Sequence, residues 1–290
     1  MLHMTTKCSR NRTLHQLKNP SRRLKTSYSP ESRHSTLAIV LAGGSGSRLG
    51  ELGSVLPKCM LAVSSRETLL TRLVSQLLEG GIRRVVVSTS PGQHPILKCF
   101  LERALISSRH SGTDNIQVSV FSNPAHALGP TAALAKTMRV HKSQKYLLAL
   151  SDIVFTVNPF LKTETDGNCV ENMLVLGPYK VGRNGIVLTS SAFVSSLMHD
   201  PITLSQELRE CALNWTGVAW FGPAVSEKII EFARNFPSQP LDEAFTFALS
   251  AGSFLGYVET GQFANINAFD DLVECQAMLQ AQASIRVDLR

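Results

Sequence analysis

Arg48 and Lys58 are two basic residues, ten positions apart, that follow a glycine-rich segment. Residues 37–63 read LAIVLAGGSGSRLGELGSVLPKCMLAV, so an apolar run precedes the glycines and the basic pair comes after them. Glycine can adopt φ > 0 and lets backbone N–H groups approach a ligand closely, which creates a nest for an anion. Arginine and lysine beside such a nest add the charge that binds phosphate. This order of residue types predicts a buried strand that delivers an anion-binding loop.

Two well-known phosphate-binding loops do not match this segment. The dinucleotide motif G-x-G-x-x-G, read from Gly44, requires glycine at position 49, where the chain has Leu49. The Walker motif G-x-x-x-x-G-K-[ST] requires a lysine directly after its second glycine, and no lysine follows Gly46 or Gly50. A different kind of phosphate loop is therefore expected.

The segment as a whole resembles the signature of the sugar-nucleotide pyrophosphorylases and related nucleotidyltransferases, which is L-A-G-G-x-G-x-R-L followed by P-K. The chain matches this signature at Leu41, Ala42, Gly43, Gly44, Gly46, Arg48, Leu49, Pro57 and Lys58. The resemblance extends over about residues 37–275. NPAHALGPTAALAKTM (123–138) is similar to the family's base-covering segment, and LLALSDIVF (147–155) is similar to its strand with the metal-binding aspartate. NWTGVAWFGPAV (214–225) and LDEAFTFALSAG (241–252) are similar to two acceptor-side elements. FANINAFDDL (263–272) is similar to the closing motif W-x-D-I-N-T-P-E-D-L.

The resemblance implies that Arg48, Lys58 and Asp152 are the catalytic residues. Arg48 would bind the departing pyrophosphate and Lys58 would lie near the α-phosphate. The nucleotide-binding residues that it implies are Leu41, Ala42, Gly43, Gly44, Ser45, Gly46, Asn123 and Gly129.

Asp152 and Asn265 are the implied ligands of Mg²⁺, the one cofactor that the resemblance predicts. Mg²⁺ favours carboxylate and phosphate oxygens. The family often has an aspartate where this chain has Asn265. Because an amide oxygen carries no charge, we expect a weaker metal site than one with two carboxylates.

The implied reaction transfers a nucleoside monophosphate from an NTP to a phosphorylated small-molecule acceptor and releases pyrophosphate. A sugar 1-phosphate is the acceptor that the resemblance favours, while a phosphocholine-like alcohol, a phosphonate or a molybdopterin-type acceptor stays open, and so does the identity of the base. A phosphate monoester, with a second pKa of about 6, is already ionised at pH 7, so none of the eight histidines is needed as a base. Positioning and charge neutralisation should carry the catalysis.

Acceptor binding departs from the family pattern. Many sugar-phosphate members carry E-K-P, whose lysine binds the acceptor phosphate, and the counterpart here is HDP at 199–201, with Asp200 at the lysine position. Lys180 or Arg183, in GPYKVGRNG, is a candidate replacement, although a solvated loop explains this pair equally well. Asp242 is a third candidate, from the acceptor-side segment.

Two alternative functions follow from these departures. A catalytically inactive, nucleotide-binding relative with a regulatory role would fit Asn265 and Asp200, although Arg48, Lys58 and Asp152 argue against it. A glycosyltransferase of similar architecture should carry Asp-x-Asp at the strand end, which the chain lacks after Asp152.

Alternating apolar runs predict the elements that position these residues. Strand-like runs at 36–42, 83–90, 115–122 and 145–155 alternate with helix-like runs at 67–81, 94–105 and 129–141, which indicates an α/β fold with a mostly parallel sheet. The second half predicts strands within 171–180, 185–191, 216–223 and 254–260 and helices near 224–236 and 241–251. The resemblance makes this a three-layer Rossmann-like, glycosyltransferase-A-like fold with helices on both faces.

The net charge of +7 comes from the N-terminal tail, because residues 1–35 hold eight basic residues and one acidic residue. We expect a disordered basic tail at 1–35 and a single catalytic domain at 36–290, with organelle targeting or a nucleic-acid-binding arm as alternatives for the tail. The balanced charge of the remainder argues against nucleic acid as a partner, and no apolar run approaches a membrane span. Six scattered cysteines without a C-x-x-C pair favour a reducing, cytoplasmic location. Homo-oligomerisation stays open.

Overall fold

The structure is a computed structural model that describes residues 35–44, 46–108, 116–161, 172–179, 186–190, 193–198, 212–251 and 256–288. Its strands are β1 (Leu37–Leu41), β2 (Arg84–Thr89), β3 (Gln117–Ser122), β4 (Tyr146–Leu150), β5 (Ile153–Phe155), β6 (Met173–Pro178), β7 (Ile186–Ser190), β8 (Phe193–Met198), β9 (Ala212–Phe221), β10 (Gly256–Glu259) and β11 (Phe263–Asn265). Its α-helices are α2 (Glu51–Val55), α3 (Leu69–Glu79), α4 (His94–Ser108), α5 (Pro130–Val140), α7 (Pro223–Asn235), α8 (Leu241–Ser250) and α9 (Phe269–Asp288). Short 3₁₀ helices are η1 (Ser47–Leu49), η2 (Lys58–Met60), η3 (Pro124–Leu128) and η4 (Pro159–Leu161).

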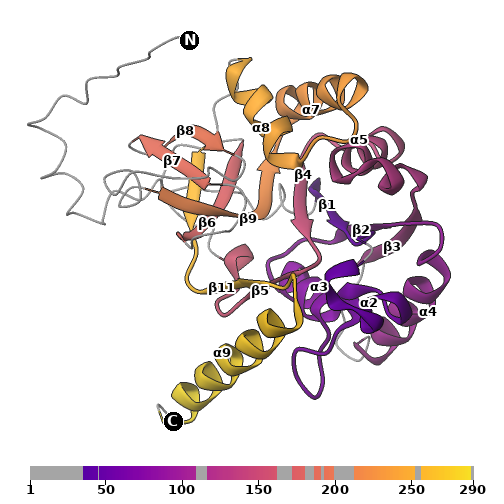
Figure 1. Ribbon diagram of the computed structural model, residues 1–290, viewed down its shortest axis with the longest axis vertical. Coiled ribbons are helices and arrows are strands. Elements are labelled where there is room, and N and C mark those ends of the chain that lie inside the picture. Colours follow the sequence, from indigo (N-terminus) through magenta and orange to yellow (C-terminus); the bar gives the residue numbers. More distant parts are fainter. Residues whose placement is uncertain are drawn as a thin grey trace, which may run out of the picture.

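A single large sheet forms the centre of the molecule (Figure 1). Within the described residues it has nine strands in the order β3–β2–β1–β4–β9–β6–β10–β8–β7, and β5 pairs separately with β11. β1 is parallel to β2 and β4, β2 is parallel to β3, and β6 is parallel to β10, whereas β9 runs antiparallel between β4 and β6. The mostly parallel α/β sheet that the sequence predicts is confirmed.

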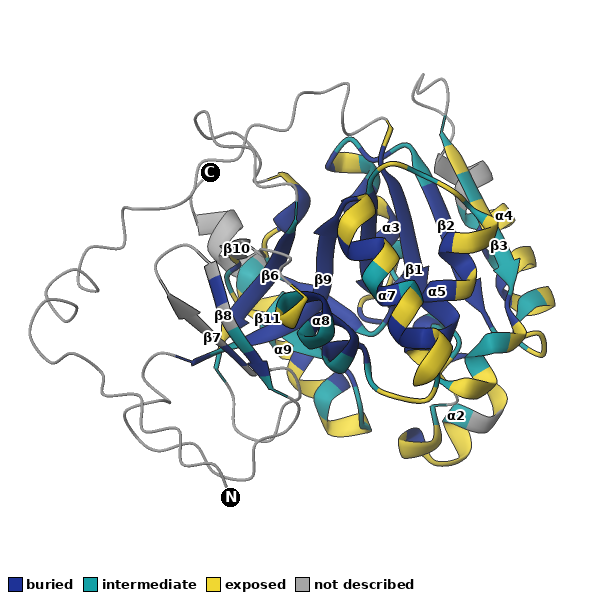
Figure 2. Cartoon of the chain, turned by 90° about the horizontal axis from the view of Figure 1, so that it is seen from above, coloured by how far each residue is buried: buried dark blue, intermediate teal, exposed yellow. Residues whose placement is uncertain are grey.

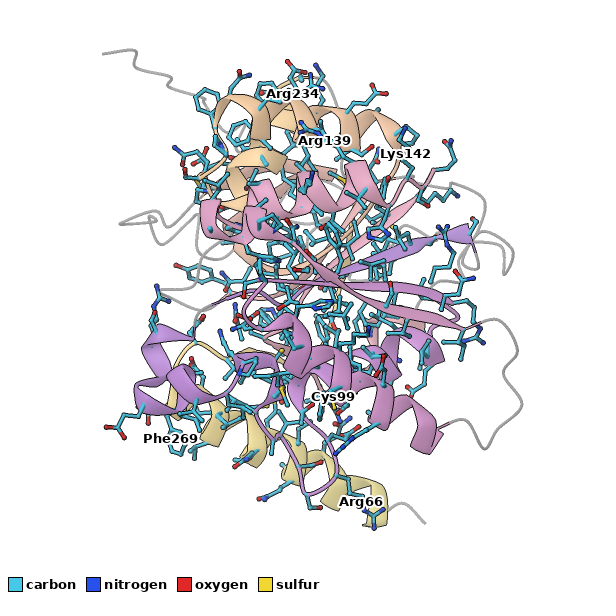
Figure 3. All side chains as sticks on the ribbon, turned by 90° about the vertical axis from the view of Figure 1, so that its right-hand side faces the viewer. Arg66, Cys99, Arg139, Lys142, Arg234 and Phe269 are labelled. Carbon is cyan, nitrogen blue, oxygen red and sulfur yellow. The ribbon has the colours of Figure 1, made fainter. Side chains whose placement is uncertain are left out.

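The sheet is covered by helices on both faces, which gives three layers. Leu37, Ile39 and Leu41 of β1 belong to a core cluster with residues of α5, α7 and α8, whereas Ala38 and Val40 belong to a second cluster with residues of α3 and α4. Successive side chains of a strand point to opposite faces, so both sets of β1 residues are buried and the strand is a continuous apolar run. Figure 2 shows the buried strands between helices whose outer sides are exposed, and Figure 3 shows the same layers edge-on, with Arg139 and Arg234 on one side and Cys99 on the other.

Most predicted elements of the first half are confirmed within a few residues. The helix-like runs 67–81, 94–105 and 129–141 correspond to α3, α4 and α5. The run 145–155 is an exception, because Ser151 and Asp152 divide it into β4 and β5. β8 was not predicted, and of α9 only the beginning was expected, as part of a strand–turn–helix in the closing segment 263–272.

The division into a tail at 1–35 and one domain at 36–290 stays a prediction, because residues 1–34 lie outside the described residues. Among the helices that the structure describes, none combines the length and the apolar composition needed to cross a bilayer.

β9 carries a bulge beside β6. Val175 of β6 pairs with Val218, but the next residue, Leu176, pairs with Trp215, so that β9 has extra residues at this point. Gly217 lies in the bulge with a φ of 83°, a conformation that glycine adopts without strain. The bulge therefore depends on a glycine.

Gly217 also lies against the residues that flank Asp152. A Cβ atom at Gly217 would lie 2.6 Å from Leu150 Cδ1 and 2.9 Å from Ile153 Cδ1, closer than atoms pack in protein interiors. The missing side chain therefore allows β9 to pack closely on the chain segment that carries Asp152.

We expect Gly217→Ala to lower the free energy of unfolding by roughly 1–3 kcal/mol, because it adds both backbone strain and a steric clash. Chemical denaturation followed by circular dichroism measures this loss. Gly92→Ala is the matched control, since its added Cβ would meet no atom within 4 Å. Equal stability of the Gly217→Ala and Gly92→Ala variants would contradict the packing described for β9.

Candidate active site

A cavity of about 400 Å³ opens where β1 and β4 end. Because β1 and β4 are parallel and Leu41 pairs with Leu150, the segments that follow both strands emerge at the same edge of the sheet. Predicted site residues on the cavity wall are Leu41, Ala42, Gly43, Gly44, Gly46, Arg48, Lys58, Gly129 and Asp152. The cavity is also lined by His126 and Pro130 of the segment 123–138, which was expected to cover the base, and by residues that were not assigned from the sequence: Ser47, Cys59, Leu150, Ser151 and Asn267.

The glycine loop after β1 is fixed to β2 by hydrogen bonds of its backbone. The N–H group of Ala42 donates to the carbonyl oxygen of Ser88 at 2.8 Å, and Thr89 Oγ1 donates to the Ala42 oxygen at 3.2 Å. Gln93 Nε2 donates to the Gly44 oxygen at 3.3 Å. The carbonyl groups of Ala42 and Gly44 are thus already bonded on the β2 side.

Gly46 and Gly53 hold the end of the glycine loop for two different reasons. Gly46 has a φ of 64°, which favours glycine, and it directly precedes η1 and the exposed Arg48. Gly53 of α2 lies so close to the Gly46 backbone that a Cβ atom there would overlap the Gly46 oxygen. Ser45, which was predicted to bind nucleotide, lies outside the described residues.

Lys58 and Asp152 form an ion pair in the cavity. Lys58 Nζ donates to Asp152 Oδ2 at 2.7 Å, and the two side chains are 15% and 22% exposed. Lys58 begins η2 directly after Pro57, and Asp152 lies in the turn between β4 and β5. The predicted catalytic lysine and the predicted metal-binding aspartate therefore meet, and Arg48 lines the same cavity.

The carboxylate of Asp152 has one oxygen available for a further ligand. Oδ1 is buried and has no hydrogen-bond partner among the residues that the structure describes, whereas Oδ2 is bonded to Lys58. A buried carboxylate oxygen without a partner is unfavourable unless a cation or a donor completes it. The described chain contains no group of three or more His, Cys, Asp or Glu side chains that could hold a metal ion by themselves.

Asn267 is a polar residue of this site that the sequence analysis missed. Its Oδ1 atom accepts a long hydrogen bond of 3.4 Å from Lys58 Nζ, and its side chain lines the cavity. The backbone N–H groups of Asn267 and Ala268 donate to Asp271 Oδ2 at 2.7 and 2.8 Å, which fixes the turn before α9. Asn265 pairs with Ile153 in the β11–β5 ladder and is not among the cavity-lining residues. The sequence already contained a signal for Asn267, since the closing motif here reads N-I-N, but only its first asparagine, Asn265, was predicted as a metal ligand.

Four other predicted residues lie away from the cavity wall or outside the described chain. Asn123 is fully buried, and its side chain bonds to the Ala133 carbonyl group and to the Ala125 N–H group instead of lining the cavity. Asp242 is 5% exposed in the first turn of α8 and does not line the cavity either. The predicted acceptor residues Lys180 and Arg183 lie outside the described residues.

The family comparison agrees with this geometry. Residues 38–170, which contain the glycine loop, Lys58 and Asp152, match the model of the MobA-like NTP transferase domain. Residues 38–170 are thus similar to nucleotidyltransferase domains. The resemblance found in the sequence is thereby confirmed.

Curated relatives match this nucleotidyltransferase segment only in part. The chain is 39% identical over 66 residues to a glucose-1-phosphate adenylyltransferase of Paraburkholderia phymatum, which covers 23% of this chain and 16% of that protein. It is 35% identical over 83 residues to a bifunctional IPC transferase and DIPP synthase of Aquifex aeolicus, which covers 27% of this chain and 19% of that protein. The chain thus spans less than a fifth of the length of these two relatives.

Solved structures show that the nucleotidyltransferase fold extends beyond residue 170. A putative glucose-1-phosphate thymidylyltransferase from Bacillus anthracis superposes with a TM-score of 0.67 at 18% identity, over 84% of this chain and 95% of the other. An inositol-1-phosphate CTP transferase from T. maritima superposes with a TM-score of 0.65 at 17% identity, over 84% and 96%. The predicted fold class is therefore confirmed for most of the chain.

Cys59 lies next to Lys58 on the cavity wall, but it is not a reactive thiol. Its side chain is 2% exposed, and burial raises its pKa to about 12. A thiol with such a pKa is almost entirely protonated at neutral pH, and the thiolate is the nucleophilic form. Cys59 is a packing residue.

We expect iodoacetamide at pH 8 to modify the exposed Cys99 in the folded protein far faster than Cys59. Mass spectrometry of the cysteine-containing peptides measures both rates. In denaturant the two thiols should react at similar rates, which serves as the control. Rapid modification of Cys59 in the folded protein would contradict the burial described above.

Proposed function

We propose that the chain is a Mg²⁺-dependent nucleotidyltransferase that transfers a nucleoside monophosphate from an NTP to a phosphorylated small molecule and releases pyrophosphate. The observation that carries this proposal is the ion pair of Lys58 Nζ with Asp152 Oδ2, 2.7 Å apart, in one cavity with the glycine loop and Arg48. A cationic hydrogen-bond donor, a carboxylate and a glycine loop together suit the binding of a polyphosphate with its metal ion.

In the proposed reaction, an oxygen of the acceptor phosphate forms a bond to the α-phosphorus of the NTP. The bond from the α-phosphorus to the bridging oxygen breaks, and pyrophosphate leaves with the electron pair. Backbone N–H groups of the glycine loop and Arg48 bind the β- and γ-phosphates, which become the leaving group. Lys58 neutralises charge at the α-phosphate. The acceptor phosphate is already ionised, so no side chain has to remove a proton.

Asp152 and Asn267 supply oxygen atoms of the type that Mg²⁺, a hard cation, prefers as ligands. One carboxylate oxygen of Asp152 is buried without a hydrogen-bond partner in the described chain, and Asn267 supplies an amide oxygen on the same cavity wall. Mg²⁺ is commonly held by one or two protein oxygens together with substrate phosphates and water, so a site with few carboxylates fits. When bound, Mg²⁺ would supply neutralisation of the phosphate charge. Asn265 remains the candidate that the sequence alone suggested.

A phosphate monoester on a sugar or an inositol is the acceptor class that we propose. Glucose 1-phosphate and inositol 1-phosphate appear in the names of similar proteins, and both are monoesters that match the proposed attack on the α-phosphorus. Lys180 and Arg183 remain candidate ligands of the acceptor phosphate. A cytoplasmic location is also proposed, because the free thiols Cys59, Cys99 and Cys275 suit a reducing compartment.

A matrix of ATP, CTP, GTP and UTP against phosphorylated acceptors tests this function. We expect one combination to release pyrophosphate in a Mg²⁺-dependent manner, measured by a coupled pyrophosphatase assay. The acceptors should include glucose 1-phosphate, inositol 1-phosphate and phosphocholine. NTP binding without turnover in every combination would instead support a nucleotide-binding regulator.

Lys58→Ala and Asp152→Ala should each lower turnover by at least about a hundredfold, because each removes charge stabilisation from the transition state. Their melting temperatures should stay close to that of the wild type. Lys98→Ala and Glu102→Ala are charge-matched controls, since both side chains are exposed on α4, and they should leave turnover unchanged. A large loss of melting temperature with retained turnover would mean that Lys58 and Asp152 have a structural role instead.

A further inference from the structure

Gly43, in the middle of the glycine loop, lies against the ring of His126. A Cβ atom at Gly43 would overlap Nδ1 and Cγ of this ring, and it would lie 2.6 Å from Cε1. Gly43 does not belong to the glycines with positive φ, so its backbone would accept another residue. Position 43 is therefore restricted to glycine by the imidazole ring and not by backbone conformation.

A buried polar network holds the His126 ring in place. Its Nε2 atom forms a hydrogen bond of 3.1 Å with Ser88 Oγ. Ser88 Oγ also accepts from Asn123 Nδ2 at 3.1 Å and from Thr137 Oγ1 at 3.0 Å, and all three of these residues are fully buried. Because Ser88 belongs to β2 and Thr137 to α5, the ring is anchored to two rigid elements rather than to its own loop.

His126 thereby contacts both parts of the cavity wall. Its ring contacts the glycine loop at Gly43, while its own segment, η3, leads directly into Gly129 and Pro130 at the start of α5. All four residues line the cavity. The distance between the glycine loop and the η3–α5 segment is thus set by the thickness of one imidazole ring.

The ring contributes shape rather than charge. Burial lowers the pKa of His126 below its ordinary value, with a smaller opposing effect of the Ser88 backbone. The neutral form of the imidazole therefore predominates at pH 7.

We propose that His126 is a positioning residue that sets the spacing between the glycine loop and the η3–α5 segment, so that the triphosphate and the nucleoside of one NTP are bound together. This inference rests on the proposed nucleotide-binding function. The role of His126 is steric, and its partner in that role is Gly43.

A four-variant cycle tests the steric role: wild type, Gly43→Ala, His126→Ala and the double variant. Isothermal titration with ATP, CTP, GTP and UTP in the presence of Mg²⁺ gives the dissociation constants. Gly43→Ala should weaken NTP binding about tenfold in the wild-type background, because the added methyl group displaces the loop or the ring. In the His126→Ala background the same methyl group enters the space that the ring has left, so its effect should fall to about twofold or less. Gly92→Ala, which meets no atom, should leave binding unchanged.

Inorganic tripolyphosphate is the second probe, and it separates positioning from loss of structure. His126→Ala should weaken NTP binding about tenfold and leave tripolyphosphate binding within about twofold of the wild type, because tripolyphosphate needs only the glycine loop. Equal losses for NTP and tripolyphosphate would mean that the loop itself collapses, which overturns the positioning role. Melting temperatures of all variants are recorded alongside.

Additive effects of Gly43→Ala and His126→Ala on NTP binding overturn this inference while leaving the proposed function intact. Non-additive effects on melting temperature alone, with NTP affinity unaffected, also overturn it, because the contact would then be purely structural. Absence of NTP binding by the wild type overturns the proposed function first and this inference with it.

Discussion

Lys58 and Asp152 are 94 residues apart in the sequence, and their side chains meet at 2.7 Å because two parallel strands end at the same edge of the sheet. The pairing register of β1 and β4 brings the two side chains together, since Leu41 lies opposite Leu150 and each of these residues is followed by a loop of the site. A pair of opposite charges in a partly buried cavity interacts more strongly than on an open surface, but the desolvation of both charges offsets this gain. The pair is therefore better understood as a polar site prepared for a ligand than as a source of stability.

The carboxylate of Asp152 shows what kind of ligand would complete the site. Lys58 satisfies one of its oxygens, while the other is buried without a hydrogen-bond partner in the described chain. Asn267 places an amide oxygen near the same lysine. A triphosphate with its cation would supply negative charge for Lys58 and positive charge for Asp152 at the same time. The charge pattern of the cavity is complementary to such a complex as a whole.

Three glycines of residues 43–53 look alike in the sequence, yet the structure requires each of them for a different reason. Gly46 has a positive φ, Gly53 lies against the backbone of Gly46, and Gly43 faces the His126 ring. From the sequence alone, the loop glycines are interpreted as a single flexible, anion-binding feature. Only the tertiary structure shows whether glycine is required by its backbone conformation or by a close neighbour, because the neighbour of Gly43 comes from a segment 83 residues later in the chain.

Local sequence patterns determined much of this protein. The alternation of apolar runs was sufficient to predict α3, α4, α5 and the parallel strands. A strand that is buried on both faces of the sheet appears as a continuous apolar run, and a helix that is buried on one face appears as an apolar stripe with helical spacing. The signature formed by the glycine loop, Arg48 and Lys58, with the later Asp152, was sufficient to recognise a resemblance to nucleotidyltransferases, and the family model matches residues 38–170. Tertiary structure alone decided that Asn123 is buried beneath the site, that Asn267 rather than Asn265 lines the cavity, and that His126 packs on Gly43. These outcomes depend on strand register and on packing between distant segments, and neither is encoded in the residue types of one short segment.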